Sequence, residues 1–134
     1  MAREERDYSH RTLADKLGVK PGARICVRGS FDEGFVTMLA GASERAPSRA
    51  VRGRYDLIFL FVGKTADLHA ISALAKALEP AGGLWIVHPK GKGASPSDAQ
   101  VRAAGLAADL VDNKISAFSE THTATRYVIP KAKR

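Results

Sequence analysis

The stretch that decides the fold is Tyr55-Asp-Leu-Ile-Phe-Leu-Phe-Val62, which holds six consecutive apolar residues from Leu57 onward. A run that is apolar on both faces is typical of a central strand in a parallel sheet covered by helices on both sides. Leu84-Trp-Ile-Val87 is a second run of this kind, and Arg24-Ile-Cys-Val-Arg28 is a third, β-rich one closed by Gly29. These runs predict strands of one sheet.

Segments with helical spacing alternate with these strands. The predicted helices span residues 8–17, 33–40, 66–79 and 97–108. Ser9 and Thr65 are placed to cap two of them, and Pro80-Ala-Gly-Gly83 is expected to end the third. Ser95-Pro-Ser-Asp98 has the pattern of a capping box with proline at the first helical position. Helices that alternate with apolar strands indicate an α/β fold with a mostly parallel sheet.

The remaining segments complete one predicted domain, residues 1–134, with frayed ends at 1–7 and 131–134. Two final runs, 114–118 and 125–129, are expected to pair as an antiparallel hairpin. Residues 41–54 read as a basic loop, with a short strand around Ala50-Val51.

Composition bounds the function. The chain has 134 residues, a formal net charge of +7 and a single cysteine, Cys26. The charge favours anionic partners, and one cysteine excludes an intramolecular disulfide and a cysteine-built zinc site. The start has no apolar core, and no run approaches the roughly 20 apolar residues of a membrane span. We therefore expect a cytoplasmic protein with no membrane partner and no metal site, whose oligomeric state stays open.

Three segments carry a family resemblance. Lys16-Leu-Gly-Val-Lys-Pro-Gly-Ala-Arg-Ile25 resembles the approach to the first strand of S-adenosylmethionine-dependent methyltransferases, and Tyr55-Asp56 with its strand resembles their fourth strand. Leu74-Ala-Lys-Ala-Leu-Glu-Pro-Ala-Gly-Gly-Leu-Trp-Ile86 is similar to their segment of leucine, proline, double glycine and apolar strand. The resemblance covers about residues 17–129 and is closest to a bacterial family of short methyltransferase-like domains with no assigned function. It implies a three-layer, Rossmann-like sandwich.

The chain departs from the family at its cofactor apparatus. The family places an acid near the end of its first strand, where this chain has Val27, and a second glycine in the next turn, where it has Phe31. Only 26 residues separate Gly29 from Asp56, so the sheet is expected to lack about one βα unit, together with the acid that holds the ribose. Asp32 or Glu33 would then be the substitute acid.

Ligands of open α/β sheets bind outside the carboxyl ends of the strands, where three loops of this chain are expected to meet. The candidate ligand-binding residues in these loops are Gly29, Ser30, Asp32, Glu33, Gly34, Lys64, Thr65, His88, Lys90 and Lys92. Free N–H groups at helix starts, together with lysines, make an anion site. The alternative is that these are solvated lysines beside ordinary turn glycines.

Other motifs are weaker. Gly63-Lys-Thr65 lacks the first glycine of a P-loop, because Ile58 stands at that position. His88 ends a buried strand, where it acts either as a general base or as a hydrogen-bond partner of the neighbouring loop. Cys26 lies mid-strand and is interpreted as an inert core thiol.

Three functions follow from this sequence. The first is a non-catalytic binding module, without a cofactor, for a small anion, a nucleotide or an acidic partner. The second is an S-adenosylmethionine-dependent methyltransferase that uses Gly29, Ser30, Asp32 and Gly34 around the cofactor. The third is nonspecific nucleic-acid binding through the loop arginines, although Tyr55 is the only aromatic residue beside them. These arginines are Arg45, Arg49, Arg52 and Arg54.

Overall fold

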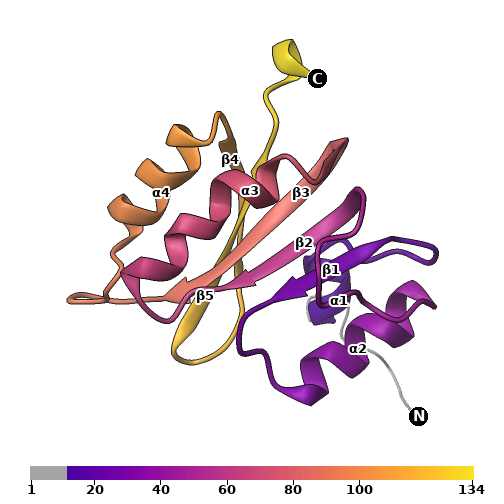
Figure 1. Cartoon of the computed structure of the whole chain (residues 1–134). Coiled ribbons are helices and arrows are strands. Elements are labelled where there is room, and N and C mark those ends of the chain that lie inside the picture. The colour runs from indigo at the N-terminus through magenta and orange to yellow at the C-terminus, as the bar shows by residue number, and fades with distance from the viewer. Residues whose placement is uncertain (1–11) are drawn as a thin grey trace.

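The computed structural model describes residues 12–134, which form a three-layer α/β sandwich (Figure 1). Its strands are β1 (Ile25–Arg28), β2 (Tyr55–Phe61), β3 (Leu78–Pro89), β4 (Val111–Ala117) and β5 (His122–Val128). Its helices are α1 (Leu13–Lys16), α2 (Glu33–Ser43), α3 (Ile71–Ala75) and α4 (Asp98–Ala107), with short 3₁₀ helices at Thr65–Ala70 and Lys131–Lys133. None of these helices is long and apolar enough to cross a membrane.

The five strands form one sheet in the order β1-β2-β3-β5-β4. β1, β2 and β3 run parallel, whereas β5 is antiparallel to both of its neighbours. The predicted mostly parallel sheet with a C-terminal antiparallel hairpin is therefore confirmed. Because β5 runs backwards, its first residues lie beside the carboxyl end of β3, with His88 opposite Thr123.

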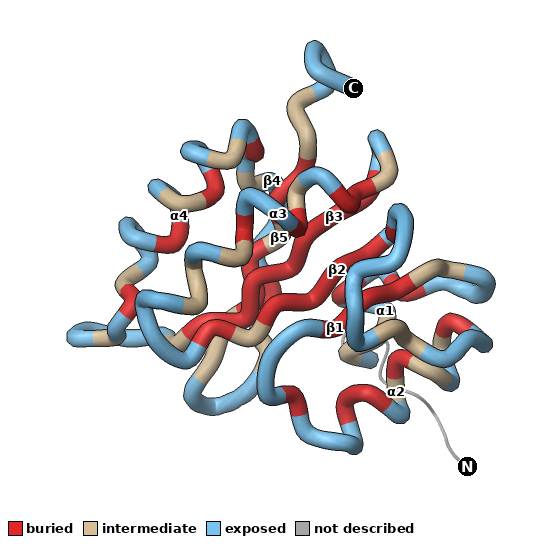
Figure 2. The backbone as a smooth tube through the Cα atoms, viewed as in Figure 1, coloured by how far each residue is buried: buried red, intermediate tan, exposed pale blue. Residues whose placement is uncertain are grey.

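Alternate side chains of the central strands build two cores, one on each face of the sheet. Phe59 and Trp85 pack with Phe35 and Leu39 of α2 on one face, which α1 also covers. Ile58 and its neighbours pack on the other face under α3 and α4. Figure 2 shows the buried residues running along the strands, which explains why their sequence is apolar without alternation. Cys26 belongs to the second core, where burial raises the pKa of its thiol, as expected for an inert core cysteine.

The predicted helix over 66–79 is wrong in its second half. The chain forms a 3₁₀ helix, then the five-residue α3, and β3 already begins at Leu78. Pro80 to Gly83 belong to this strand because β3 bulges there, its pairing shifting from Tyr55↔Leu78 to Leu57↔Gly83. A Cβ at Gly82 would lie 2.9 Å from the carbonyl oxygens of Tyr55 and Asp56. The double glycine therefore permits close approach of β2 instead of ending a helix.

The other differences are local. Thr12 caps α1, accepting a hydrogen bond of 3.1 Å from the Asp15 amide, and the predicted cap Ser9 lies outside the described residues. Ser97 caps α4 in a capping box with Gln100, so Pro96 precedes the helix instead of starting it.

Among the described residues, β1 is the edge strand of the sheet. The predicted strand around Ala50-Val51 is wrong, because Val51 is exposed and the loop makes a single parallel bridge, Cys26↔Ser48. The connection from β1 to β2 thus contains α2 and a loop but no further strand, in agreement with a shortened sheet. Near the C-terminus, Lys133 Nζ lies 3.3 Å from the Asp109 carboxylate.

Candidate functional site at the carboxyl ends of the parallel strands

The loop after β1 requires glycine at its first position. Gly29 has φ +99°, and a Cβ there would lie 2.8 Å from the Phe61 carbonyl oxygen on β2. Only glycine adopts this conformation without strain and also lets the two strand ends approach so closely. The close approach of β2 is therefore enough to explain why position 29 is glycine.

The two acids of this loop already have partners. Asp32 caps α2, its carboxylate accepting a hydrogen bond of 2.8 Å from the Phe35 amide. Glu33 forms an ion pair with Arg49 at 3.2 Å. Ser30 and Gly34 are exposed beside them. Neither acid is free to act as the substitute acid that the sequence suggested without giving up one of these contacts.

Aromatic rings fill the space above this loop. Phe31 is 8% exposed, and its ring stacks on that of Phe35 with centroids 4.8 Å apart. The edges of Phe61 and Phe118 approach the same ring, with centroid distances of 5.4 Å and 6.2 Å. We call Phe31, Phe35, Phe61 and Phe118 the aromatic cluster. None of the five cavities that we describe within residues 12–134 is lined by a residue of the loop 29–34.

In the loop after β2, a carboxylate of the protein binds two backbone amides. The Asp67 carboxylate accepts hydrogen bonds from the backbone amides of Gly63 and Lys64, at 2.9 Å and 3.1 Å. The sequence predicted free N–H groups at the helix start beside this loop, and a carboxylate of the protein already binds the two amides that precede it. Thr65 begins a 3₁₀ helix here and not the expected α-helix. The Lys64 side chain is exposed.

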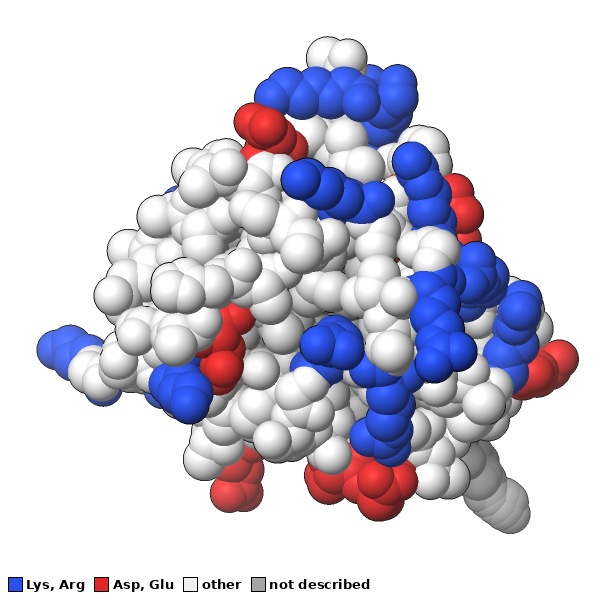
Figure 3. Space-filling view, in the orientation of Figure 1, with Lys and Arg blue, Asp and Glu red and all other residues white. Residues whose placement is uncertain are grey.

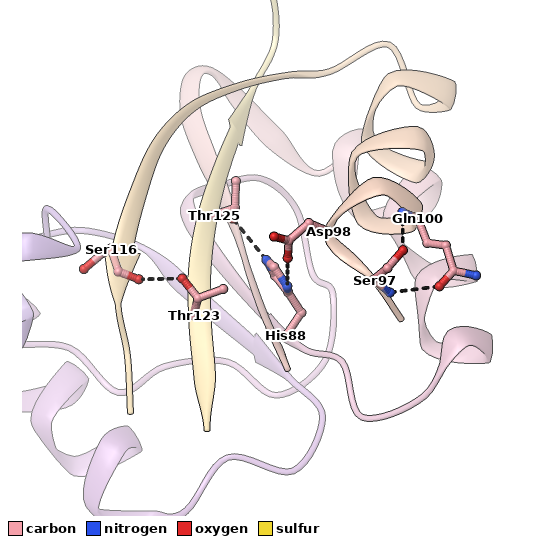
Figure 4. A network of polar contacts seen from close by, with 7 residues as sticks. All are labelled: His88, Ser97, Asp98, Gln100, Ser116, Thr123 and Thr125. Carbon is pink, nitrogen blue, oxygen red and sulfur yellow. Dashed lines mark hydrogen bonds and ion pairs between the residues drawn. The ribbon is translucent and has the colours of Figure 1, made fainter. Parts of the chain in front are cut away.

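The end of β3 differs, because its polar group is incompletely paired. His88 is 2% exposed, and its Nε2 lies 3.0 Å from the Thr125 hydroxyl on β5 (Figure 4). Its Nδ1 has no hydrogen-bond partner and lies 3.7 Å from the Asp98 carboxylate at the start of α4. Burial lowers the pKa of His88, with a smaller opposing effect from Asp98. The ring is therefore neutral at pH 7, and its partner is a strand residue rather than the neighbouring loop.

A cavity of about 500 Å³ opens beside His88, between α4 and the hairpin β4–β5. Its polar walls are His88, Asp98, Arg102, Asp112, Thr123, Thr125 and Tyr127. Arg102 and Asp112 form an ion pair of 3.3 Å between α4 and β4. Burial, reinforced by Asp112, raises the pKa of Tyr127 to about 12. The cavity thus combines a neutral imidazole, two carboxylates, one arginine and a neutral phenol with apolar walls.

Of the residues that line this cavity, only His88 was predicted from the sequence as a candidate site residue. Asp98 appeared only as the end of a capping pattern, and the residues from β4 and β5 were missed. The alternation of Thr123, Thr125 and Tyr127 along one strand is the signal that could have placed them on one face. Lys90 and Lys92 lie exposed in the loop that leads from β3 to α4. The structure therefore places the three predicted loops at one edge of the sheet. The cavity beside His88 adjoins the third loop, and Thr65 of the second loop lines a separate cavity with residues of α3 and α4.

Two arginines of the basic loop, residues 41–54, already have partners within the fold. Arg49 pairs with Glu33, and Arg45 donates to the Gly22 carbonyl at 3.3 Å. Tyr55 is buried, its hydroxyl bonding the backbone of Ala50 and Arg52, so its ring is not free to stack on a base. Figure 3 shows that Lys and Arg gather on the side of β1 and the loop leading to β2, whereas the α4 side is largely uncharged. Arg52 and Arg54 are exposed on this side.

No group of three or more His, Cys, Asp or Glu residues within the described chain could hold a metal ion. No family model and no curated protein sequence matches the chain. Solved structures do match. A S-adenosylmethionine-dependent methyltransferase from Aquifex aeolicus superposes with a TM-score of 0.65 and 12% identity, covering 86% of each chain. The fold is that of the methyltransferases.

A second methyltransferase-fold structure supports this. Magnesium protoporphyrin IX methyltransferase from Synechocystis PCC 6803, with S-adenosylhomocysteine bound, superposes with a TM-score of 0.65. The identity is 16%, over 87% of this chain and 78% of that one. The Rossmann-like, methyltransferase-like resemblance seen in the sequence is thus confirmed for the fold. At this identity the comparisons show the fold alone, and they give no support to the expected lack of a cofactor.

Proposed function

We propose that this chain is a non-catalytic ligand-binding domain that keeps the methyltransferase fold and takes a small molecule beside His88. The observation that carries the proposal is the burial of Phe31 in the aromatic cluster, at the position where the family turn has its second glycine. A side chain there fills the space that close backbone approach to a cofactor needs. The residues present therefore do not fit S-adenosylmethionine.

The surroundings of the loop support this conclusion. Val27, at the position of the family's first acid, is buried in the core against apolar neighbours. Asp32 and Glu33 are engaged in a helix cap and an ion pair. Within residues 12–134 no strand beyond β1 supplies an acid for a ribose, because the loop from β1 to β2 makes only the bridge at Ser48. A nucleoside cofactor would find few free acceptors at this loop.

The cavity beside His88 suits a small ligand with hydrogen-bond donors. A volume of about 500 Å³ lies within the range of small-molecule sites. The carboxylates of Asp98 and Asp112 are acceptors, and the walls between them are largely apolar. The proposed ligand is therefore a compact molecule with N–H or O–H groups and an apolar body, which differs from the anion expected from net charge.

A methyltransferase is the second candidate, and the fold comparisons favour it. In this candidate Gly29, Ser30, Asp32 and Gly34 surround the cofactor. The Phe31 ring must then leave the aromatic cluster to make room. Such a movement exposes apolar surface, which opposes cofactor binding.

Calorimetric titration with S-adenosylhomocysteine separates the two candidates. The binding-domain proposal predicts no heat of binding up to millimolar ligand at neutral pH and moderate salt. A micromolar Kd, worth about −8 kcal/mol, would overturn it in favour of the methyltransferase. Phe31→Gly serves as the matched variant: binding that appears or tightens identifies the ring as the obstacle, and binding that is lost identifies it as a stacking partner.

A further inference from the structure

A second cavity region lies at the opposite edge of the sheet, at the amino ends of β2 and β3. Two adjoining cavities there, of about 390 and 260 Å³, are both lined by Gly18, Lys20, Leu57 and Arg126. Lys114 of β4 lines the smaller one. We call these two cavities together the amino-end groove. Nothing in the sequence drew attention to it, because its cations come from three distant segments.

The position of Arg126 is built into the sheet. Its guanidinium lies across β3 above Gly83, where a Cβ would overlap its Nε and lie 2.7 Å from its Cζ. Any other residue at position 83 would push the guanidinium aside. The second glycine of the double-glycine segment therefore makes the slot in which Arg126 lies.

Arg126 has no electrostatic partner among residues 12–134. Its side chain makes no hydrogen bond and no ion pair there, and the same holds for Lys20 and Lys114. The one carboxylate lining the groove, Asp56, accepts a hydrogen bond of 2.8 Å from the Arg24 amide. Burial lowers the pKa of Arg126, with a further contribution from Arg134.

Such an arrangement is costly unless something compensates it. A partly buried charge without a counter-charge loses hydration and gains nothing in return. The other arginines that cross between elements have partners, as Arg102 has Asp112 and Arg49 has Glu33. Arg126, Lys20 and Lys114 instead converge with like charge on one hollow whose floor is apolar Leu57 and Trp85.

We propose that the amino-end groove binds the oxyanion group, phosphate or carboxylate, of a small organic molecule. The planar fork of Arg126 matches two oxygens of such a group, and Lys20 and Lys114 supply point charges on either side. The apolar floor accommodates the carbon part of the ligand. This site lies at the opposite edge of the sheet from the cavity beside His88. The proposal therefore does not depend on the function of the carboxyl edge.

Calorimetry with inorganic pyrophosphate and with citrate, at low salt, tests the proposal on the whole chain. We expect at least one probe to bind, and the preferred probe identifies the oxyanion as phosphate or carboxylate. Arg126→Met is expected to weaken binding at least tenfold. Arg54→Met is the matched control, because it removes the same charge from an exposed position and is expected to change the affinity less than twofold.

Two further variants keep the test decisive. If Arg126→Met does not fold, Lys114→Met on the exposed edge strand replaces it, with an expected loss of at least threefold. Gly83→Ala keeps every charge but displaces the guanidinium, so it is expected to weaken binding as well. Failure of both probes to bind the unmodified protein would overturn the proposal. Equal losses for Arg126→Met and Arg54→Met would also overturn it, since they would reveal only general attraction to a basic protein.

Discussion

The loops after β1 and β3 follow two strands of the same parallel sheet and end at the same edge, yet one is closed and the other opens into a cavity. After β1, the Phe31 ring packs among three other rings and the acids beside it cap a helix and pair with Arg49. After β3, His88 keeps a ring nitrogen unpaired beside about 500 Å³ of space. A shared scaffold position therefore does not specify a ligand site, because the side chains that follow each strand decide whether the position stays open.

The contrast has a simple energetic basis. Apolar rings gain stability by packing together, so a phenylalanine in a turn closes it. A buried imidazole with one free nitrogen gains nothing from closure, and it favours a polar partner. The loop after β1 contributes to stability, whereas the loop after β3 adjoins the cavity in which we propose that a ligand binds. Each of the following predictions tests one side of this difference.

The largest expected effect is on stability at Phe31. Phe31→Ala should lower the free energy of unfolding by about 3–5 kcal/mol, because a buried ring is replaced by a void. Urea denaturation followed by circular dichroism measures the change. Leu106→Ala, at a position 54% exposed, is the control and should have a much smaller effect. A loss below about 1 kcal/mol at Phe31 would mean that the ring is not packed as described.

Gly29→Ala is expected to cost about 2–3 kcal/mol, since the residue has positive φ and faces the Phe61 carbonyl oxygen at close range. Gly34→Ala is the matched control within the same loop. A Cβ there would meet only the Asp32 carboxylate, at 3.3 Å, and no positive φ is involved. Equal costs at the two positions would show that Gly29 is not constrained by β2.

Burial of the Tyr127 hydroxyl makes the free energy of unfolding depend on pH in the alkaline range. The pKa of Tyr127 is raised to about 12, from its ordinary value of 10, so the folded state holds the phenolic proton more tightly than the unfolded state does. This contribution is fully present below pH 10 and is lost as the pH rises through 12, for a total of about 2.7 kcal/mol. Tyr127→Phe should lose less stability than the unmodified protein between pH 10 and 12. Parallel stability curves would contradict the burial of this hydroxyl.

Asp98→Asn should lower the pKa of His88 further, because Asp98 opposes the effect of burial. NMR titration of the His88 ring measures the direction. Asp109→Asn, beyond the far end of α4, is the control and should leave that pKa unchanged. An unchanged His88 pKa in Asp98→Asn would mean that the Asp98 carboxylate has no electrostatic effect on the imidazole.

The smallest effects are expected where the sequence placed an anion site. Lys64→Ala should change stability by less than about 0.5 kcal/mol, because its side chain is exposed and Asp67 already binds the backbone amides of this loop. Asp67→Ala is the contrasting variant and should destabilise the loop by about 1 kcal/mol through loss of a cap. Thermal denaturation compares the two. A larger loss of stability for Lys64→Ala would mean that the Lys64 side chain has a role that its exposure does not indicate.

The sequence predicted the layers well because they depend on local pattern. The apolar run from Leu57 to Val62 is typical of a central strand, and the hairpin was predicted from two short runs. The double glycine was misread as a helix stop, because its actual reason is the approach of Tyr55, Asp56 and Arg126 from elsewhere in the chain. Phe31 was recognised as a departure, but only packing shows that its ring is buried. The cavity beside His88 needs α4 to lie over β5, which no spacing in the sequence expresses.

The central claim is that binding capacity at the carboxyl edge lies after β3 and not after β1. Amide chemical-shift mapping of the ¹⁵N-labelled protein tests it, with S-adenosylhomocysteine and a set of small donor-bearing fragments added in turn. The account predicts that S-adenosylhomocysteine leaves the amides of residues 29–34 unmoved, whereas fragments shift those of His88, Asp98 and Thr125. Shifts at residues 29–34 that saturate with micromolar S-adenosylhomocysteine would contradict it and establish the cofactor site that the fold suggests.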